Sequence, residues 1–267
     1  QEFDNVLVAF SGGKDSGVML NLCYNYADEH GLLDKLTMYH LDYEAQYQMT
    51  TEYVTRTFLE QFPGIRKMWY CVPIKAQSAC ALGEPYWTPW DAAKKKLWVR
   101  PMPENPYVIN EKNLDVPFRH GMVDYEFQDK LSRHFAKKHG NTAVMVGLRA
   151  DESLNRYAAV ARGNKRTSYE GRKWITRADA VTVSAYPLYD WRVSDVWTAN
   201  ARFGFDYNRL YDLLYQAGLT IGQMRVASPF NDCAQESLKL YKVIDPANWA
   251  RMVGRVNGVN FTGLYGG

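Results

Sequence analysis

Near its start the chain reads Val6-Leu7-Val8-Ala9-Phe10-Ser11-Gly12-Gly13-Lys14-Asp15-Ser16-Gly17-Val18-Met19-Leu20. An apolar run typical of a strand ends at a Ser-Gly-Gly turn, and apolar residues then recur at helical spacing. Where a helix begins, several backbone N–H groups lack partners and the helix dipole is positive, so an anion fits there. Lys14 adds a full charge, and the hydroxyls of Ser11 and Ser16 can donate hydrogen bonds. The stretch therefore predicts a strand, a glycine turn and a helix, with a phosphate site at the turn.

The same residues have a plainer interpretation, a turn followed by a helix N-cap. A Walker loop does not fit, because Val8 stands where its first glycine would be and Asp15 follows Lys14. The string Ser11-Gly12-Gly13-Lys14-Asp15-Ser16 resembles instead the PP-loop of ATP pyrophosphatases and of the phosphoadenosine phosphosulfate (PAPS) reductase family. This resemblance implies that residues 11–16 bind the phosphates of a nucleotide.

Strands and helices alternate along much of the chain. We expect further strands at residues 36–41, 68–72, 142–146 and 181–186, and helices at residues 17–30, 44–62 and 123–139. Such alternation predicts an α/β fold with a doubly wound parallel sheet, which the resemblance implies is Rossmann-like and of the adenine nucleotide α-hydrolase type. Ligands of such sheets bind at the carboxyl ends of the strands. Asp42 follows a strand at this edge, so it is expected to contact the nucleotide or a metal ion, or else to cap a turn or helix.

A second loop follows the strand at 142–146 and reads Gly147-Leu148-Arg149-Ala150-Asp151-Glu152-Ser153-Leu154-Asn155-Arg156. It resembles the second nucleotide motif of the same family, G-[IL]-R-x-x-E-S-x-x-R, and matches it at Gly147, Arg149, Glu152, Ser153 and Arg156. The alternative is an ion pair between Glu152 and Arg156 on a surface helix. The later segments Pro187-Leu188-Tyr189-Asp190-Trp191 and Asp195-Val196-Trp197 resemble the signature that closes the family's core. The resemblance covers residues 5–200.

Two regions fall outside the alternation. Residues 73–120 hold seven of the eleven prolines, together with Trp87, Trp90 and Trp98, which predicts an ordered insertion that acts as a lid or recognises an acceptor. Residues 200–267 have apolar residues at helical spacing. We therefore expect a PP-loop nucleotide-binding domain at residues 1–199, which includes the insertion, and a helical C-terminal subdomain at residues 200–267.

Composition limits the class of protein. The chain has 267 residues, of which 46% are hydrophobic and 23% charged, enough to bury a full core. It has neither an apolar run long enough for a membrane span nor a visible signal peptide, although it lacks an initiating Met, so a targeting segment could have been removed. Four cysteines without a C-x-x-C pair predict a reduced, cytoplasmic protein in which we expect no iron–sulfur cluster. Cys71, Cys80 and Cys233 could still converge in space.

Basic residues are concentrated in two places. Between Arg162 and Arg177 six basic residues stand against the single acid Glu170, a local charge of +5 where the whole chain carries +3. A second cluster comprises residues 94–96 and Arg100. Such clusters are usually solvated surface, but they also suit polyphosphates or nucleic acid.

The resemblance also implies a reaction and its ligands. The PP-loop serves nucleophilic attack on an α-phosphate with release of pyrophosphate, so ATP or PAPS and Mg²⁺ are expected. Lys14, Asp15, Arg149 and Arg156 are the implied catalytic residues, and Asp15 and Asp42 are the implied carboxylates for the metal. Gly147, Glu152 and Ser153 are expected to complete the nucleotide site.

Three functions stay open at this point. The first is an ATP pyrophosphatase that adenylylates an unknown acceptor. The second is a sulfonucleotide reductase or sulfotransferase. The sequence departs from the reductase pattern, because it has no Glu-Cys-Gly-Leu-His tail and Cys233 is its sole late cysteine. The third is a nucleotide-gated regulatory protein that binds nucleic acid between Arg162 and Arg177. The aromatic insertion is most similar to a bacterial and phage branch related to regulators of immunoglobulin-binding proteins, which implies a ParB-like protein partner.

Overall fold

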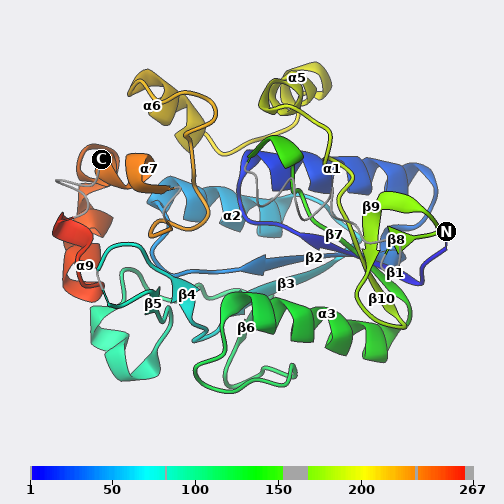
Figure 1. The fold of residues 1–267 in the computed structure, drawn as a ribbon, viewed down its shortest axis with the longest axis horizontal. Helices are drawn as coiled ribbons and strands as arrows, with labels where there is room; N and C mark the ends of the chain where they lie inside the picture. Colours follow the sequence, from blue (N-terminus) through cyan, green and yellow to red (C-terminus); the bar gives the residue numbers. More distant parts are fainter. Residues whose placement is uncertain (1, 82, 153–167, 232–233, 262–267) are drawn as a thin grey trace. The chain divides into compact units, whose positions relative to one another are not determined.

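The computed structural model of the chain describes residues 2–81, 83–152, 168–231 and 234–261, apart from the side chains of Glu152, Ser168 and Lys173 (Figure 1). An eight-stranded sheet has the strand order β6-β3-β2-β1-β7-β10-β9-β8, and a separate ladder joins β4 to β5. The strands are β1 (Asn5–Ala9), β2 (Leu36–Leu41), β3 (Arg66–Cys71), β4 (Ala76–Gln77), β5 (Tyr86–Trp87), β6 (Val108–Asn110), β7 (Thr142–Met145), β8 (Ser168–Tyr169), β9 (Arg172–Arg177) and β10 (Thr182–Ala185).

Most neighbouring strands run parallel. β1 pairs with β2 and with β7, so that Val6 faces both Leu36 and Ala143, and β10 continues the parallel order beside β7. β3 and β6 are also parallel, whereas β9 and β8 are antiparallel additions at one edge. Parallel strands need crossovers, and α1 (Lys14–Glu29) and α3 (Asp124–His139) lie on opposite faces of β1 and β7 (Figure 1). The predicted mostly parallel α/β fold is confirmed.

The chain divides into two compact units, each built from three separate segments. Unit 1 comprises Gln1–His40, Glu60–Met68 and Gln128–Tyr207, and unit 2 comprises Leu41–Leu59, Trp69–Phe127 and Asn208–Gly267. The units are interleaved in sequence. The division into domains at residues 1–199 and 200–267 stays a prediction.

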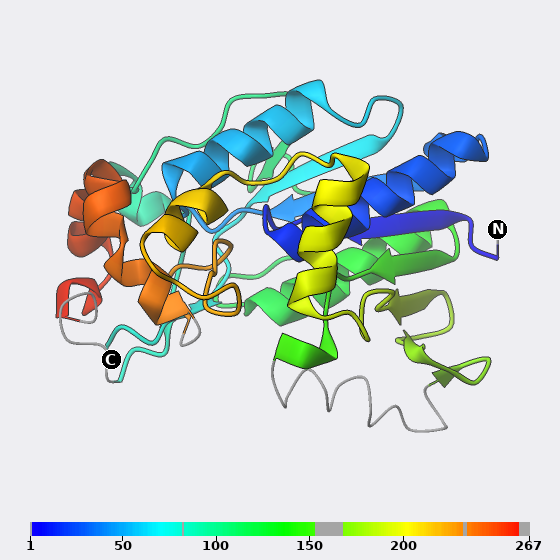
Figure 2. The ribbon, with the colours of Figure 1, turned by 90° about the horizontal axis from the view of Figure 1, so that it is seen from above.

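Unit 1 is built around β1 and α1. Leu7, Val8, Val18 and Leu20 have no exposed surface, because β1 is covered on both faces and α1 presents its apolar side to the sheet. α5 crosses α1 and packs on it (Figure 2). Besides α1 and most of α3, this unit holds η1 (Leu33–Lys35), η3 (Ala150–Glu152) and α5 (Val193–Phe203).

Unit 2 has an aromatic core. Trp69 of β3 is fully buried and lies against Phe58 of α2, with ring centroids 4.9 Å apart. Tyr47 and Tyr241 stack at 3.5 Å, and so join the segment before α2 to the C-terminal helices. The helices of this unit are α2 (Gln48–Glu60), η2 (Ala92–Leu97), α6 (Leu210–Gln216), α7 (Gln235–Lys239), α8 (Tyr241–Ile244) and α9 (Pro246–Arg255).

Three details differ from the sequence-based expectations or add to them. The helix predicted at residues 44–62 begins only at Gln48, because Glu44 has a φ of 64°, in the left-handed region that a helix cannot continue. β8 and β9 lie in the basic stretch, where no strand was predicted. No helix in the described part of the chain is both long and apolar enough to cross a membrane.

Candidate functional site

The glycine turn between β1 and α1 has the geometry that its sequence predicts. Gly12 has a φ of 79°, which glycine adopts without a steric cost, and Gly13 is the N-cap of α1. Since Gly13 has no side chain, it cannot accept hydrogen bonds from the N–H groups of the first turn. The start of α1 therefore keeps its positive dipole end without a side-chain cap.

Two serines fix the shape of this turn. Ser16 Oγ accepts from the backbone N–H of Ser11 at 3.1 Å and donates to the carbonyl of Gly13 at 3.0 Å. The Oγ atoms of Ser11 and Ser16 lie 3.0 Å apart, and Ser11 Oγ accepts from the backbone N–H of Gly13 at 3.3 Å. Both hydroxyls thus brace the turn from within.

Lys14, Asp15 and Arg149 form what we call the loop cluster. Lys14 Nζ lies 3.0 Å from Asp15 Oδ2, and Arg149 Nε donates to Asp15 Oδ1. The side chains of Lys14 and Arg149 are only 3% exposed, whereas that of Asp15 is 14% exposed. Arg149 also contacts Asp151 Oδ2 at 3.3 Å, and the Asp151 side chain is 53% exposed. Two nearly buried cations therefore share one carboxylate at the start of α1.

The charges of the cluster control the ionisation of Asp15. Burial alone raises the pKa of this carboxyl group, but the positive charges of Lys14 and Arg149 outweigh burial and hold the pKa below its usual value of 3.8. Asp15 is thus an anion at neutral pH, and the two cations are partly neutralised by it.

Gly147 brings the second loop against the first. A Cβ atom at this position would lie 3.1 Å from the backbone C and O of Asp15 and 3.1 Å from the N of Ser16. Real Cβ contacts are rarely so short, so only glycine lets the chain after β7 pass this close to α1. The glycine that begins the second motif thus places Arg149 beside Asp15.

The segment at residues 187–191, which resembles the signature that closes the family's core, contacts Arg149 and the residue after it through backbone carbonyls. The backbone N–H of Ala150 donates to the carbonyl of Tyr189 at 2.8 Å, and Arg149 Nη1 donates to the carbonyl of Trp191 at 3.5 Å. Asp195 Oδ2 then accepts from the backbone N–H of Arg192 at 2.7 Å and so helps to cap α5. The sequence analysis did not assign these carbonyls or Asp151 to the site. The one sequence feature that could have indicated Asp151 is its position two residues after Arg149.

Asp42 contacts Arg100, Trp69 and Glu44, which belong to unit 2 as it does. Both carboxylate oxygens lie 2.6 Å from Nη2 of Arg100, and Oδ2 also accepts from Trp69 Nε1 at 2.8 Å. Oδ1 accepts from the backbone N–H of Glu44 at 2.8 Å, and Asp42 has no exposed surface. This carboxylate is therefore surrounded by donors from its own unit.

Several predicted residues lie outside the described part of the chain. Ser153, Arg156 and Cys233 belong to this group, and for Glu152 the structure describes only the backbone, in η3. Of the basic stretch from Arg162 to Arg177, the described end forms β8 and β9, where Arg172 lies 3.4 Å from Glu2. The roles expected for all of these residues stay predictions.

A family model described as the phosphoadenosine phosphosulfate reductase domain matches residues 5–229, which include the glycine turn, the Gly147 loop and the segment up to Trp191. The chain belongs to this family. A second model, described as a domain of unknown function (DUF3440), matches residues 218–267. Neither match distinguishes branches of the family, so the narrower resemblance to phage-related regulators stays a prediction.

Individual relatives are similar over much of the chain. The uncharacterized protein YbdN of Escherichia coli (strain K12) is 36% identical over 265 residues, which are 98% of this chain but 63% of YbdN. The chain thus spans less than two thirds of that relative. Among solved structures, the PAPS reductase of Candida auris in its phosphate complex has a TM-score of 0.41 at 13% identity, covering 83% of this chain and 80% of its own. The FMN adenylyltransferase of Candida glabrata has a TM-score of 0.42 at 13% identity, and the match covers 78% of this chain and 50% of that protein's chain.

Proposed function

We propose that the chain binds an adenine nucleotide at the start of α1 and transfers its adenylyl group to an acceptor, with release of pyrophosphate. The loop cluster is the observation that carries this proposal, because it sets two cations beside an uncapped helix N-terminus. Membership of a family described by its action on a phosphosulfate nucleotide supports an adenine nucleotide as the ligand. PP-loop chemistry, inferred from residues 11–16, supports pyrophosphate as the leaving group.

The proposed reaction needs little covalent chemistry from the protein. A nucleophile of the acceptor attacks the α-phosphorus, and the bond from that phosphorus to the bridging oxygen breaks. Pyrophosphate leaves with the electron pair, so negative charge grows on its oxygens. Lys14 and Arg149 would exchange part of their contact with Asp15 for these oxygens and stabilise the developing charge, while the N–H groups at the turn orient the phosphates.

Asp15 is the carboxylate that we propose for Mg²⁺. Mg²⁺ in nucleotide sites is usually held by one or two carboxylates together with waters and phosphates. Asp15 is ionised and lies at the turn, so it suits this arrangement. Among the described residues no three His, Cys, Asp or Glu side chains are grouped to hold a metal, so the phosphates would supply other ligands. When bound, Mg²⁺ would neutralise phosphate charge. Asp42 is left out of this proposal because four donor contacts already surround its oxygens.

The proposal can be tested by binding and by product formation. Calorimetry with the ATP analogue α,β-methylene-ATP and Mg²⁺ should show binding that Lys14→Ala abolishes. Lys137→Ala is the matched control, since it removes the same charge from an exposed position of α3 in the same unit. Release of pyrophosphate from ATP is then measured with and without cell extract as a source of acceptor. Nucleotide binding that is equal in Lys14→Ala and Lys137→Ala would reject the site.

A sulfonucleotide reaction is a second candidate, and the family description favours it. Such a reaction needs a nucleophilic thiolate. Burial raises the pKa of Cys23 to about 12 and that of Cys71 well above its usual value, so neither suits this role. Cys80 is also buried, which leaves Cys233, outside the described residues, as the thiol to test. Tighter binding of PAPS than of ATP, no pyrophosphate release and loss of turnover in Cys233→Ser would establish this second function instead.

A further inference from the structure

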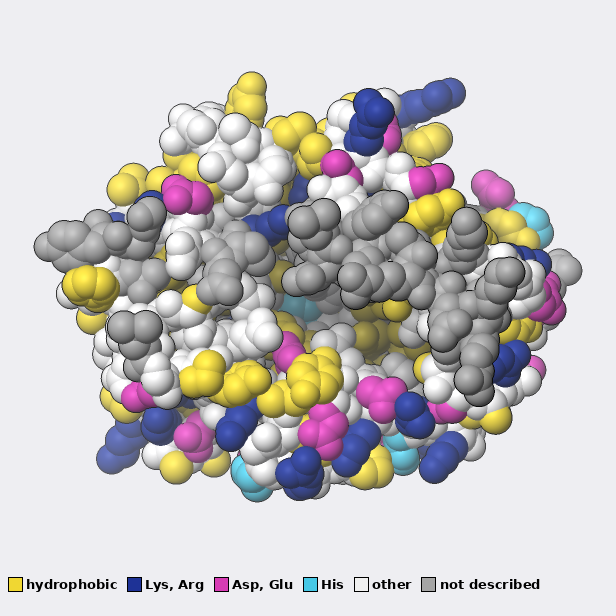
Figure 3. Space-filling model, viewed as in Figure 1, with side chains coloured by type: hydrophobic (Ala, Val, Ile, Leu, Met, Phe, Trp, Pro, Cys, Tyr) yellow, Lys and Arg dark blue, Asp and Glu magenta, His cyan; other side chains and the backbone are white. Residues whose placement is uncertain are grey.

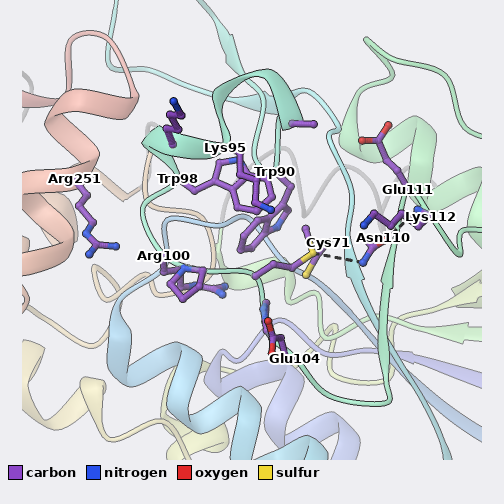
Figure 4. A pocket seen from close by; sticks show the side chains of 15 residues that line it. Cys71, Trp90, Lys95, Trp98, Arg100, Glu104, Asn110, Glu111, Lys112 and Arg251 are labelled. Carbon is purple, nitrogen blue, oxygen red and sulfur yellow. Dashed lines mark hydrogen bonds between the residues drawn. The ribbon is translucent and has the colours of Figure 1, made fainter.

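A cavity of 690 Å³ lies within unit 2. Its walls come from η2 and the segment after it, from the turn that follows β6, and from α9 (Figure 4). The volume is within the range of about 300–1,000 Å³ that is typical of small-molecule sites. None of the described residues predicted for the nucleotide site lines this cavity, so the two sites can be examined separately.

The charged lining of the cavity is mostly basic. Two lysines of η2, Lys95 and Lys96, face it together with Lys112 and Arg251, while Glu104 and Glu111 supply the only carboxylates of its described lining. Glu111 Oε1 is already 3.0 Å from Nε2 of His120. In the described part of the chain the four cations form no ion pair with a carboxylate, although Lys95 lies 5.8 Å above the ring of Trp98. Figure 3 shows basic side chains gathered over η2.

Arg100 adds a buried cation to one wall. It is 9% exposed, its charge is balanced by Asp42, and its guanidinium lies 5.0 Å from the ring centroid of Trp90. Its Nε is buried and finds no hydrogen-bond acceptor among the described residues. A buried donor of this kind is costly to leave unsatisfied, and an anion in the cavity is the kind of group that would supply the missing acceptor.

A hydrogen-bond network centred on Glu44 joins the walls of the cavity. Glu44 has no exposed surface, and its carboxylate accepts from the backbone N–H groups of Trp90 at 2.7 Å and Val99 at 3.1 Å. The same carboxylate binds Arg255 Nε at 2.8 Å. Arg251, one turn earlier on α9, donates to the carbonyl of Val99 at 3.2 Å. The walls are thus fixed before a ligand arrives, and binding to a preformed site loses less conformational entropy.

We propose that this cavity binds a small ligand that carries two or more phosphate groups. In Figure 4, Arg251 and Lys112 lie on opposite sides of the cavity and Lys95 lies between them, so a single phosphate group would leave some of the cations without a partner. Lysine ammonium groups are point charges that bind phosphate in any orientation. The phosphates can belong to a free small molecule or to the end of a nucleic-acid strand, and the experiment distinguishes the two.

The test uses inorganic tripolyphosphate as the probe. Calorimetric titration is done on Lys14→Ala protein, so that the glycine turn does not contribute, and again on the native chain saturated with α,β-methylene-ATP in case the variant does not fold. Lys112→Gln and Arg251→Gln are each expected to raise the Kd roughly three- to tenfold. Lys75→Gln is the matched control, because it removes an exposed charge of the same unit that does not line the cavity, and its Kd should stay unchanged.

Each outcome decides the proposal. A Kd that rises in Lys112→Gln and in Arg251→Gln, and that also rises with salt concentration, would support it. Competition by a 5′-phosphorylated tetranucleotide would identify a strand end as the source of the phosphates, and no competition would identify a small molecule. Equal affinity in Lys112→Gln, Arg251→Gln and Lys75→Gln, or binding that disappears once the glycine turn is blocked, would overturn the proposal. Binding of α,β-methylene-ATP should be unaffected by all three variants, so the nucleotide site can fail independently.

Discussion

The loop cluster of unit 1 and the Glu44–Arg255 pair of unit 2 are both buried ion pairs, but their carboxylates are satisfied in different ways. Asp15 is held by two side-chain cations beside a glycine turn and remains 14% exposed. Glu44 is fully buried and accepts from two backbone N–H groups as well as from Arg255. The first arrangement can exchange its partners for a phosphate without breaking backbone contacts. The second cannot, because its donors belong to the fold itself.

The largest effect is expected when the second arrangement is broken. Glu44→Gln leaves Arg255 as a buried cation without its counter-charge, which typically lowers the free energy of unfolding by about 3–5 kcal/mol. Urea unfolding measures this change, with Glu60→Gln as the exposed control that should change stability by less than about 0.5 kcal/mol. Equal stability of the two variants would show that the pair is not what fastens the insertion to α9.

The next effect concerns binding rather than stability. Lys14→Met keeps the length of the side chain but removes the charge, so nucleotide affinity should fall by a factor of about 30–150, since a charged hydrogen bond contributes about 2–3 kcal/mol. The free energy of unfolding should change by less than about 1.5 kcal/mol, because Arg149 still neutralises Asp15. Calorimetry and urea unfolding on the same preparation separate these quantities. A Lys14→Met variant that is strongly destabilised yet binds the nucleotide normally would show that the loop cluster serves stability rather than binding.

A smaller effect is expected at the contact between the two loops. Gly147→Ala places a methyl group 3.1 Å from backbone atoms of Asp15 and Ser16, so the second loop must shift and Arg149 with it. We expect nucleotide affinity to fall about five- to tenfold and stability to fall by about 1–2 kcal/mol, the usual cost of overpacking. Gly222→Ala is the control, since its Cβ would meet nothing within 4 Å. Identical affinity in both variants would argue against close apposition of the loops.

The smallest effect is a dependence on pH. Because the pKa of Asp15 is lowered in the folded protein, its ion pairs stabilise the fold above the unfolded pKa, near 3.8, and this stabilisation is lost as the pH falls through the lower folded value. The stability difference between the native chain and Asp15→Asn should therefore be constant at neutral pH and shrink below about pH 4. Urea midpoints at pH 7, 5, 4 and 3 measure it. A stability difference between the two proteins that grows as the pH falls would contradict a lowered pKa of Asp15 in the folded protein.

The sequence predicted the parts that depend on local order. The strand, glycine turn and helix at residues 6–20 follow from short-range periodicity and turn chemistry, and the structure has them where they were expected. It could not predict that Asp42 would be surrounded by Arg100, Trp69 and Glu44, because these donors come from positions up to 58 residues away. Nor could it predict the left-handed Glu44, whose conformation depends on contacts with Trp90, Val99 and Arg255 rather than on its neighbours in sequence.

The Glu44–Arg255 pair also has a consequence for how the chain is made. The two residues are 211 positions apart, so a ribosome releases the carboxylate long before it releases the guanidinium. During that interval the surroundings of Glu44 cannot be dehydrated without leaving a buried charge unpaired, which keeps this part of unit 2 open to water. The local elements of the glycine turn are complete much earlier. We therefore expect the nascent chain to acquire its first strand and helix early and to close unit 2 only after α9 has emerged.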